Sequence, residues 1–169
     1  MIEELIDTYS DYLFRIAFIY TKDEKIAEEV VQDVFLKFYQ TKDRYDGRAS
    51  MKTYLTKMTI NRSYDYLRNW KHRTFSLLEQ FTVTTKGADR QVLQHEERGE
   101  ITAAVLKLHL KYREVLLLYY YEDLQVNDIA EFLQVPVSTV KTRLQRGRER
   151  LKQTLPKQQW EVLASDDTR

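Results

Sequence analysis

Glycine and proline, the residues that most often interrupt regular structure, are scarce in this chain: 4 Gly and 2 Pro occur among its 169 residues. Apolar residues recur at spacings of three and four almost throughout, which is the period of a helix with one apolar face. No long alternating pattern typical of a half-buried strand is present. The sequence therefore predicts an all-α fold.

The first part of the chain predicts three helices. The first covers residues 2–20. The second begins where Thr21 and Glu24 form a capping-box pattern, and it ends near residue 40. After a loop, Ser50 is expected to cap a third helix that continues to about residue 73.

The helical pattern fades after residue 73, which predicts a flexible linker. Helical spacing returns at Ile101 and continues to Tyr121, and two shorter helices follow and end at Leu155, before Pro156. The prediction is two small helical domains joined by the linker. The divisions are a first domain (1–73), the linker (74–98), a second domain (99–157) and a C-terminal tail (158–169).

Composition excludes several classes of protein. The absence of cysteine rules out disulfides, thiol catalysis and Cys-ligated metal, and three scattered histidines leave little for any metal site. The N-terminus is acidic where a signal peptide is basic, and the longest apolar run is seven residues, so a cytoplasmic protein without membrane insertion is expected. No glycine-rich phosphate loop or nucleophile motif supports a helical enzyme, so neither catalysis nor a cofactor is expected.

The net charge of +1 conceals two basic segments. Residues 51–76 hold six basic and one acidic side chain, and residues 136–157 hold seven and one. Acidic segments elsewhere cancel them. The order of charge along the chain therefore indicates nucleic acid more clearly than the total does.

Residues 129–140 have the layout of a helix-turn-helix. Ala130 is a small residue where a second helix must cross closely, a turn containing Gln134 follows, and a longer helix begins near Ser138. Gln134 occupies a position where Gly or Asn better accepts left-handed backbone, so mild strain is expected. At 100° per residue the longer helix has one apolar stripe, formed by Val140, Leu144, Gly147 and Leu151.

The opposite face of the longer helix is polar and basic, which suits the DNA major groove. Arg, Gln and Thr read base edges there, and flanking Lys and Arg suit phosphates. The expected DNA-binding residues are Ser138, Thr139, Lys141, Thr142, Arg143, Gln145, Arg146 and Arg148. A solvated basic helix face is the alternative, but the helix-turn-helix layout and the one-sided placement favour DNA.

The first basic segment gives a weaker signal. On its helix one stripe consists of Asn61, Asp65, Arg68 and His72, and Arg62, Asn69 and Arg73 lie beside it. Amides and arginines near aromatic residues suit single-stranded or partly melted nucleic acid. A solvated helix face is the alternative, and this pattern alone does not decide between them.

The second helix has an unusual polar side. Ile26, Ala27, Val30, Val34 and Phe38 point one way. The other side holds Glu28, Glu29, Gln32 and Asp33, and also the large residues Leu36 and Tyr39. Two interpretations stay open: isolated exposed apolar residues, or a surface that docks a basic protein partner.

Four segments carry a resemblance to a known family. They are Val31-Gln32-Asp33-Val34-Phe35-Leu36-Lys37, the stretch from Thr53-Tyr54-Leu55 through Asn61 to Asp65-Tyr66-Leu67-Arg68, Tyr112-Arg113-Glu114-Val115, and Val137-Ser138-Thr139-Val140-Lys141-Thr142-Arg143-Leu144. Together they resemble the extracytoplasmic-function (ECF) sigma factors of bacterial RNA polymerase, in family order between residues 5 and 155. A helix-turn-helix regulator that does not replace a polymerase subunit is the alternative, and it needs only the second domain to bind DNA.

The resemblance implies a two-domain promoter-specificity subunit without catalysis. The segment 28–39 would dock on the clamp helices of the largest catalytic subunit of core RNA polymerase, and the helix-turn-helix would read the −35 element of promoter DNA as duplex. The segment 43–73 would read and melt the −10 element, with the loop 46–50 as the pocket for a flipped base. The implied −10 residues are Arg48, Ser50, Asn61, Arg62, Asp65, Arg68 and Asn69, and the implied docking residues are Glu29, Gln32, Asp33, Leu36 and Tyr39.

The resemblance also implies control by a membrane-anchored anti-sigma factor, through which the chain would be held at the membrane. Three residues depart from the family pattern: Tyr54 where Trp is frequent, Gln134 in the turn, and Gly147 where Ala is usual. None of them removes an implied polymerase or DNA residue. The tail 158–169 lies outside the match.

Overall fold

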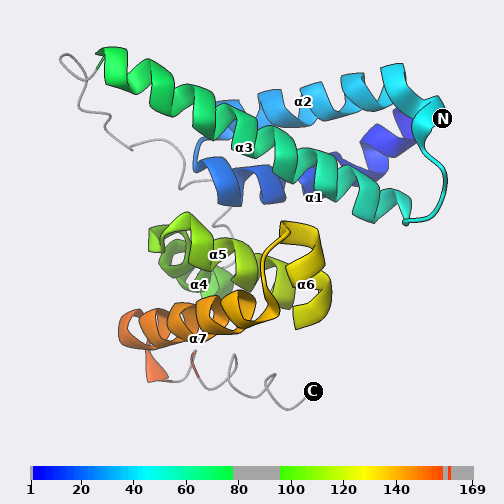
Figure 1. Cartoon of the computed structure of the whole chain (residues 1–169). Helices are drawn as coiled ribbons and strands as arrows, with labels where there is room; N and C mark the ends of the chain where they lie inside the picture. The colour runs from blue at the N-terminus through cyan, green and yellow to red at the C-terminus, as the bar shows by residue number, and fades with distance from the viewer. Residues whose placement is uncertain (1, 78–95, 158–159, 161–169) are drawn as a thin grey trace. The chain divides into compact units, whose positions relative to one another are not determined.

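A computed structural model describes residues 2–77, 96–157 and 160, and within them all regular structure is helical (Figure 1). The chain divides into two units, residues 1–88 and 89–169. The predicted all-α fold with two helical domains is confirmed. Most of the tail and most of the predicted linker lie outside the described residues.

The first unit is a bundle of three mutually packed helices, α1 (Ile2–Thr21), α2 (Glu24–Thr41) and α3 (Met51–Leu77), with a 3₁₀ turn, η1 (Lys42–Arg44), after α2. Its core includes Leu13 and Ile16 of α1, Val30 and Val34 from the predicted apolar side of α2, and Leu55 of α3. Thr59 and Ser63 are also buried, and their hydroxyls donate to the carbonyls of Leu55 and Thr59 at 2.9 and 2.8 Å. These small side chains are therefore buried with their hydrogen bonds made.

Two predicted details of the first unit are wrong. The cap of α2 is Asp23, whose carboxylate accepts from the Ile26 N–H at 2.9 Å. Thr21 is instead the last residue of α1, and its hydroxyl donates to the Ala17 carbonyl. The capping-box interpretation of Thr21 and Glu24 fails because Asp is an equally good cap and stands directly before the helix. The third helix continues to Leu77 rather than ending at residue 73, since no Gly or Pro stops it. Ser50 does cap that helix, because its hydroxyl accepts from the Thr53 N–H at 3.1 Å.

The second unit contains α4 (Glu96–Lys107), α5 (Leu110–Leu116), a π-helical turn η2 (Leu117–Tyr121), α6 (Val126–Leu133) and α7 (Val137–Thr154). The helix expected from Ile101 to Tyr121 is in fact interrupted. His109 adopts extended backbone there, and its Nδ1 accepts from the Lys111 N–H at 3.4 Å, so a new helix begins. Helix α4 also begins earlier than expected, at Glu96, where acidic residues in the sequence favour a helix N-terminus.

The helix-turn-helix forms as the sequence predicts. Helices α6 and α7 pack together, and α7 also packs on α5. The four predicted stripe residues of α7, Val140, Leu144, Gly147 and Leu151, are its four buried residues. Gln134 ends α6 with φ 55° and ψ 46°, the left-handed conformation predicted for the turn.

Gly147 allows α7 to approach α5 closely. A Cβ at this position would lie 3.1 Å from Leu116 Cδ1 and 3.6 Å from Tyr112 Cβ. The contact at 3.1 Å requires the Leu116 side chain to shift slightly, so glycine matches the observed separation of the two helices.

Candidate functional site

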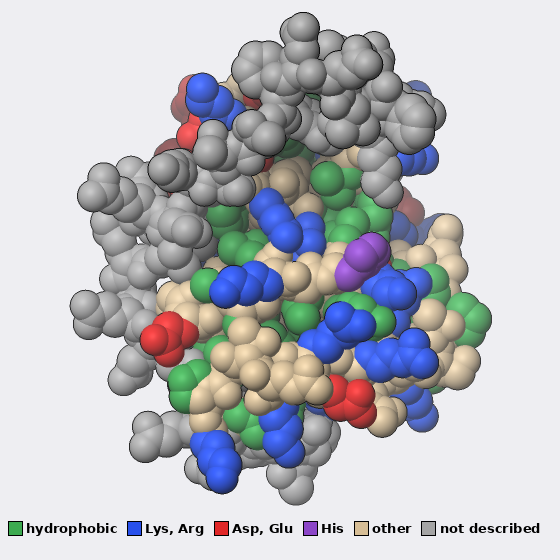
Figure 2. All heavy atoms as spheres, turned by 90° about the vertical axis from the view of Figure 1, so that its left-hand side faces the viewer, with side chains coloured by type: hydrophobic (Ala, Val, Ile, Leu, Met, Phe, Trp, Pro, Cys, Tyr) green, Lys and Arg blue, Asp and Glu red, His purple; other side chains and the backbone are tan. Residues whose placement is uncertain are grey.

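The exposed face of α7 carries the residues expected to read DNA. Ser138, Lys141, Thr142, Gln145 and Arg146 are exposed, while Thr139, Arg143 and Arg148 are half-buried. The face is therefore polar along its length, above the buried stripe that fixes the helix on α5 and α6. Lys and Arg side chains gather on one face of the second unit in the space-filling view (Figure 2).

All three predicted DNA-binding arginines of α7 have partners inside the second unit, and those of Arg143 and Arg148 lie on the preceding helices. Arg143 Nη1 donates at 3.2 Å to Glu114 Oε1, and the Glu114 side chain is only 4% exposed. Arg148 Nε donates at 2.9 Å to the Tyr120 hydroxyl, and its guanidinium lies 5.2 Å from the Tyr119 ring centroid. Both guanidinium groups are therefore oriented before any ligand arrives, which helix periodicity cannot reveal.

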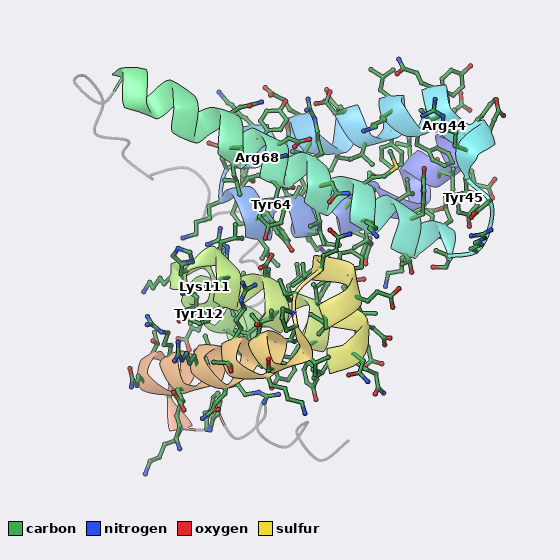
Figure 3. All side chains as sticks on the ribbon, viewed as in Figure 1. Arg44, Tyr45, Tyr64, Arg68, Lys111 and Tyr112 are labelled. Atoms are coloured by element: carbon green, nitrogen blue, oxygen red, sulfur yellow. The ribbon has the colours of Figure 1, made fainter. Side chains whose placement is uncertain are left out.

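The structure also packs the start of α5 against α7, with Tyr112 next to Arg146 and Gly147. Lys111 and Tyr112, labelled in Figure 3, join Arg143, Arg146 and three hydroxyl residues in lining one surface depression of about 300 Å³. Neither Lys111 nor Tyr112 is among the residues that the sequence predicts to bind DNA. The only signal in the sequence is the Tyr112–Val115 segment, which was part of the resemblance.

Tyr112 forms the centre of a cationic cluster. Its side chain is buried, Arg146 hydrogen-bonds to its hydroxyl, and the Lys111 Nζ and Arg150 Cζ atoms lie 5.1 and 5.0 Å from its ring centroid. Burial alone raises the pKa of Tyr112, but the hydrogen bond from Arg146 and the charges of Lys111 and Arg150 outweigh it, so the pKa lies below the ordinary value of 10.0. The lowered pKa reports a positive local potential.

In the first unit, the residues expected at the −10 element lie on α3 and the loop before it. Asn61, Asn69 and Arg68, the last of which is labelled in Figure 3, are exposed. Asp65 is half-buried and forms an ion pair with Arg68. His72 and Arg73 lie where side chains are not described. The polar stripe of this helix is therefore accessible over the described part of its length.

The loop before α3 is held at both ends. The Tyr45 hydroxyl donates to the Ala49 carbonyl at 2.6 Å, and the rings of Tyr45 and Tyr54 are 5.1 Å apart. Arg48 is 90% exposed and pairs with Asp46 at 3.2 Å, while Gly47 between them has φ 72°. Arg48 therefore extends into solvent, whereas Ser50 is engaged as the cap of α3.

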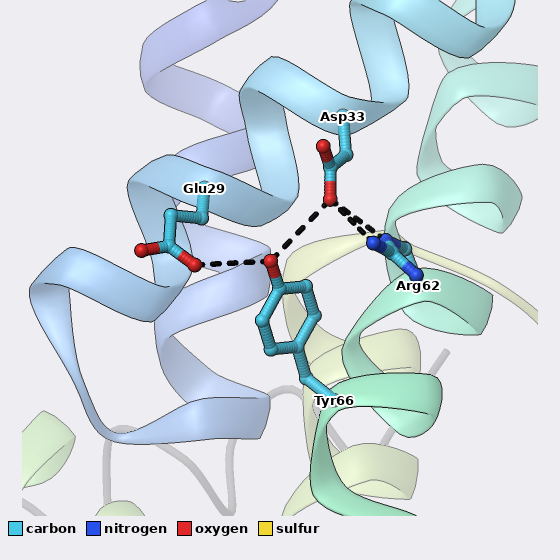
Figure 4. A network of polar contacts seen from close by, with 4 residues as sticks. All are labelled: Glu29, Asp33, Arg62 and Tyr66. Carbon is cyan, nitrogen blue, oxygen red and sulfur yellow. Dashed lines mark hydrogen bonds and ion pairs between the residues drawn. The ribbon is translucent and has the colours of Figure 1, made fainter. Parts of the chain in front are cut away.

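Residues assigned to two different surfaces are bonded to each other between α2 and α3 (Figure 4). Arg62 donates to Asp33 Oδ2 through Nε at 2.9 Å and through Nη2 at 2.6 Å. The Tyr66 hydroxyl donates to Glu29 at 3.0 Å and to Asp33 at 3.4 Å. An expected DNA residue, Arg62, is thus held by the expected docking residue Asp33, and Tyr66 links Asp33 to a second one, Glu29.

This network changes the titration of its members. The hydrogen bond to Asp33 raises the pKa of Arg62 above its ordinary value. Burial, and then the hydrogen bond to Glu29, raise the pKa of Tyr66 above 10.0. Arg62 and Asp33 both keep more than a third of their side-chain surface exposed, so the pair itself is a modest stabilising contact.

The expected docking side of α2 is exposed. Leu36 and Tyr39 are 57% and 56% exposed, and Gln32 and Glu29 are also on the surface. Leu36 and Asp33 border a groove of about 410 Å³ between α2 and α3. Two large apolar side chains are therefore exposed on α2, and one of them, Leu36, borders a groove lined by both apolar and charged residues.

Two further searches of the described residues bear on the site. No group of three or more His, Cys, Asp or Glu side chains gathers there in a way that could hold a metal ion. Among the same residues, no helix is both long enough and apolar enough to cross a membrane.

The fold and its surfaces define a two-unit helix-turn-helix protein, and comparison with known proteins gives its family. The models of sigma-70 region 2 and sigma-70 region 4 match residues 5–73 and 98–151. The ECF RNA polymerase sigma factor SigW of Bacillus subtilis (strain 168) is 28% identical over 163 residues, covering 90% of this chain and 87% of SigW. SigX of the same organism is 29% identical over 150 residues, covering 85% of this chain and 77% of SigX.

Solved structures agree in fold. The sigma factor RpoE, in its complex with the anti-sigma factor NepR from Bartonella quintana, matches with a TM-score of 0.71 at 19% identity, covering 90% of this chain and 94% of RpoE. CnrH, in complex with the cytosolic domain of CnrY, matches with a TM-score of 0.61 at 22% identity, covering 89% of this chain and 84% of CnrH. The chain belongs to the sigma-70 family and is an ECF sigma factor.

Proposed function

We propose that this sigma factor binds core RNA polymerase and directs it to promoters through two separate DNA contacts. The exposed polar face of α7, opposite a fully buried apolar stripe, is the observation that carries the proposal. A helix held in this way can enter the major groove of a −35 duplex with its side chains already oriented. Residues 99–157 form the −35 domain in this proposal, joined by a linker (74–98) to a −10 domain (1–73) and followed by a tail (158–169).

The first unit contributes the other two contacts. Asn61, Arg68 and Asn69 on α3 face solvent beside aromatic residues, which suits the bases of a melted −10 element. The exposed Leu36 and Tyr39 on α2, among acidic residues, suit the clamp helices of the largest catalytic subunit. No catalytic step belongs to the chain in this proposal, because the polymerase supplies the chemistry.

We further propose that an anti-sigma factor regulates the chain in the cytoplasm. The similar structures of RpoE and CnrH were each solved with a protein partner, NepR and the cytosolic domain of CnrY. A partner that covers α2 or α7 would block polymerase or DNA directly. Anchoring of that partner in the membrane would hold the sigma factor there until release.

Transcription in vitro tests the proposal. The purified full chain is added to core polymerase with a library of promoter fragments, and core polymerase alone is the control. We expect transcripts with defined start sites that share upstream −35 and −10 sequences. Duplex binding without any transcripts would instead support a helix-turn-helix regulator that replaces no polymerase subunit.

A further inference from the structure

Helix α2 carries two carboxylates one turn apart on its docking side. Glu29 is exposed and Asp33 is half-buried, and they stand four residues apart. Like charges at this spacing on a helix repel each other, so the two side chains alone would spread apart in solvent. In the structure they are instead joined through α3, by the hydroxyl of Tyr66 and the guanidinium of Arg62 (Figure 4).

The bonds of this network all fall on one oxygen of each carboxylate. Asp33 Oδ2 accepts from Arg62 Nε at 2.9 Å and from Nη2 at 2.6 Å, and the Tyr66 hydroxyl lies 3.4 Å from the same atom. Glu29 Oε2 accepts from the Tyr66 hydroxyl at 3.0 Å. The outer oxygens, Asp33 Oδ1 and Glu29 Oε1, point away from the network in Figure 4. Because each oxygen of an ionised carboxylate is a hydrogen-bond acceptor, both outer oxygens can accept from a cation of another molecule.

Arg62 is engaged on two sides by this network. Two of its nitrogens donate to Asp33, and its Cζ lies 4.8 Å from the centroid of the Tyr66 ring. The bond to Asp33 also raises the pKa of Arg62, because it favours the charged guanidinium. This group therefore faces α2, although the sequence places it beside the −10 stripe. With two carboxylates and one guanidinium, the network keeps one net negative charge and still attracts a basic partner.

The network adjoins the apolar part of the docking side. Asp33 and Arg62 line the groove of about 410 Å³ that Leu36 also borders, and Leu36 is 57% exposed. An apolar anchor with oriented polar groups at its edge is the usual arrangement of a protein interface. Side chains that are already fixed lose less conformational entropy on binding than mobile ones do, so orienting the carboxylates before contact favours binding.

We propose that Tyr66 and Arg62 are positioning residues for polymerase docking, which hold Glu29 and Asp33 with their outer oxygens toward a basic segment of core polymerase. The inference rests on the proposed function, since it assumes that α2 faces the polymerase. It gives Tyr66 a role that the sequence does not predict. It also transfers Arg62 from the −10 surface to the docking surface.

Removal of one hydroxyl tests the role of Tyr66, with core affinity measured by fluorescence titration of labelled core polymerase with the full chain. Tyr66→Phe keeps the ring beside Arg62 and the charge of the network, so only the bonds to the carboxylates are lost. Ordering one side chain during association corresponds to about a 2- to 10-fold change in affinity, and core polymerase should bind Tyr66→Phe more weakly by that factor. Tyr54→Phe is the matched control and should bind like the wild type, since Tyr54 is a half-buried tyrosine of the same helix whose ring packs on Phe38 and Tyr45.

A double-mutant cycle separates positioning from a general effect on the fold. In a Glu29→Ala background the Tyr66 hydroxyl has lost its nearer partner, so Tyr66→Phe should weaken core binding less than it does in the wild type. In a Leu36→Ala background, where both carboxylates remain, the full loss should persist. Losses of equal size in both backgrounds would overturn the inference, because Tyr66 would then act on the stability of the first unit rather than through Glu29.

Arg62→Lys tests the assignment of Arg62. Lysine keeps the charge that a DNA phosphate would need, but it cannot donate from two nitrogens to Asp33. The substitution should therefore weaken core binding about as much as Tyr66→Phe does. Once core polymerase is saturated with the variant, the complex should bind a −10 single strand like the wild type. Weaker strand binding with unchanged core affinity would assign Arg62 to DNA and overturn the inference.

The outcomes separate this inference from the proposed function. If the wild-type chain binds core polymerase but supports no transcription, the promoter role fails while the double-mutant cycle still decides the role of Tyr66. If transcription occurs and Tyr66→Phe binds core polymerase like Tyr54→Phe, the positioning role fails and the sigma role stands. If the wild-type chain binds no core polymerase, both fail.

Discussion

Replacing Leu36 with glutamate should separate polymerase binding from folding. Leu36 is 57% exposed on α2, so the substitution removes little packing from the free chain. An exposed position of this kind changes the free energy of unfolding by within about 0.5 kcal/mol. The thermal unfolding midpoint of Leu36→Glu should therefore stay close to that of the wild type.

The substitution should instead weaken the binding of the chain to core polymerase. Fully burying a leucine side chain contributes about 1.5–3 kcal/mol, so burying the exposed 57% contributes about 0.9–1.7 kcal/mol. Leu36→Glu removes this burial free energy. It also adds the cost of desolvating a carboxylate near Asp33, which borders the same groove. The total of at least about 2 kcal/mol corresponds to roughly 30-fold weaker core binding.

Fluorescence titration of labelled core polymerase with each full-length variant measures this loss. Ile6→Glu is the matched control, because Ile6 is a 39% exposed apolar residue on α1 of the same unit and receives the same charge. We expect Ile6→Glu to bind core polymerase like the wild type, and both variants to bind duplex DNA normally. Equal core affinity of Leu36→Glu and Ile6→Glu would refute the docking surface on α2.

Three further predictions concern α7 and the network in the first unit. Arg146→Ala should relax base preference at one −35 position. Lys141→Ala should weaken binding to all sequences and lower the slope of log affinity against log salt concentration. Competition binding to a −35 library distinguishes the two effects. Gly147→Ala should gain about 1 kcal/mol of helix propensity, but its Cβ would lie 3.1 Å from Leu116 Cδ1. The increase in the free energy of unfolding, measured with denaturant, should therefore be larger in a Leu116→Ala background than in the wild type. Equal gains would contradict the close contact. Because the pKa of Tyr66 is raised, its stabilising contribution is complete below pH 10 and is lost as the pH rises through its folded pKa. The free energy of unfolding of Tyr66→Phe should therefore fall less steeply than that of the wild type above pH 10. Parallel pH profiles of the two proteins would count against the network.

The helix-turn-helix could be predicted almost completely from the sequence, because its signals are local. A helical stripe depends only on spacing, so Val140, Leu144, Gly147 and Leu151 are buried as expected. The left-handed residue at Gln134 follows equally from the length of the turn. The boundaries of helices were less predictable, since Thr21 and Asp23 compete as caps and only the full backbone decides between them.

Contacts between helices could not be predicted in the same way. Periodicity places Arg62 on the flank of α3 and Asp33 on the polar side of α2, but it does not show that the two side chains meet. The same limit applies to Arg143, whose partner Glu114 lies 29 residues earlier on another helix. Such pairs depend on the packing distance and the rotamers of two elements together, so a one-dimensional pattern assigns them to solvent or ligand.

The proposed function requires two units of one chain to contact two different promoter elements in the presence of polymerase. Photocrosslinking from single residues in the polymerase–promoter open complex measures these contacts. A photoreactive amino acid replacing Thr142 on α7 should crosslink to duplex DNA at the −35 element. The same group replacing Asn61 on α3 should crosslink to a single strand at the −10 element. Crosslinks from both positions to the same element, or none from Asn61, would contradict the account.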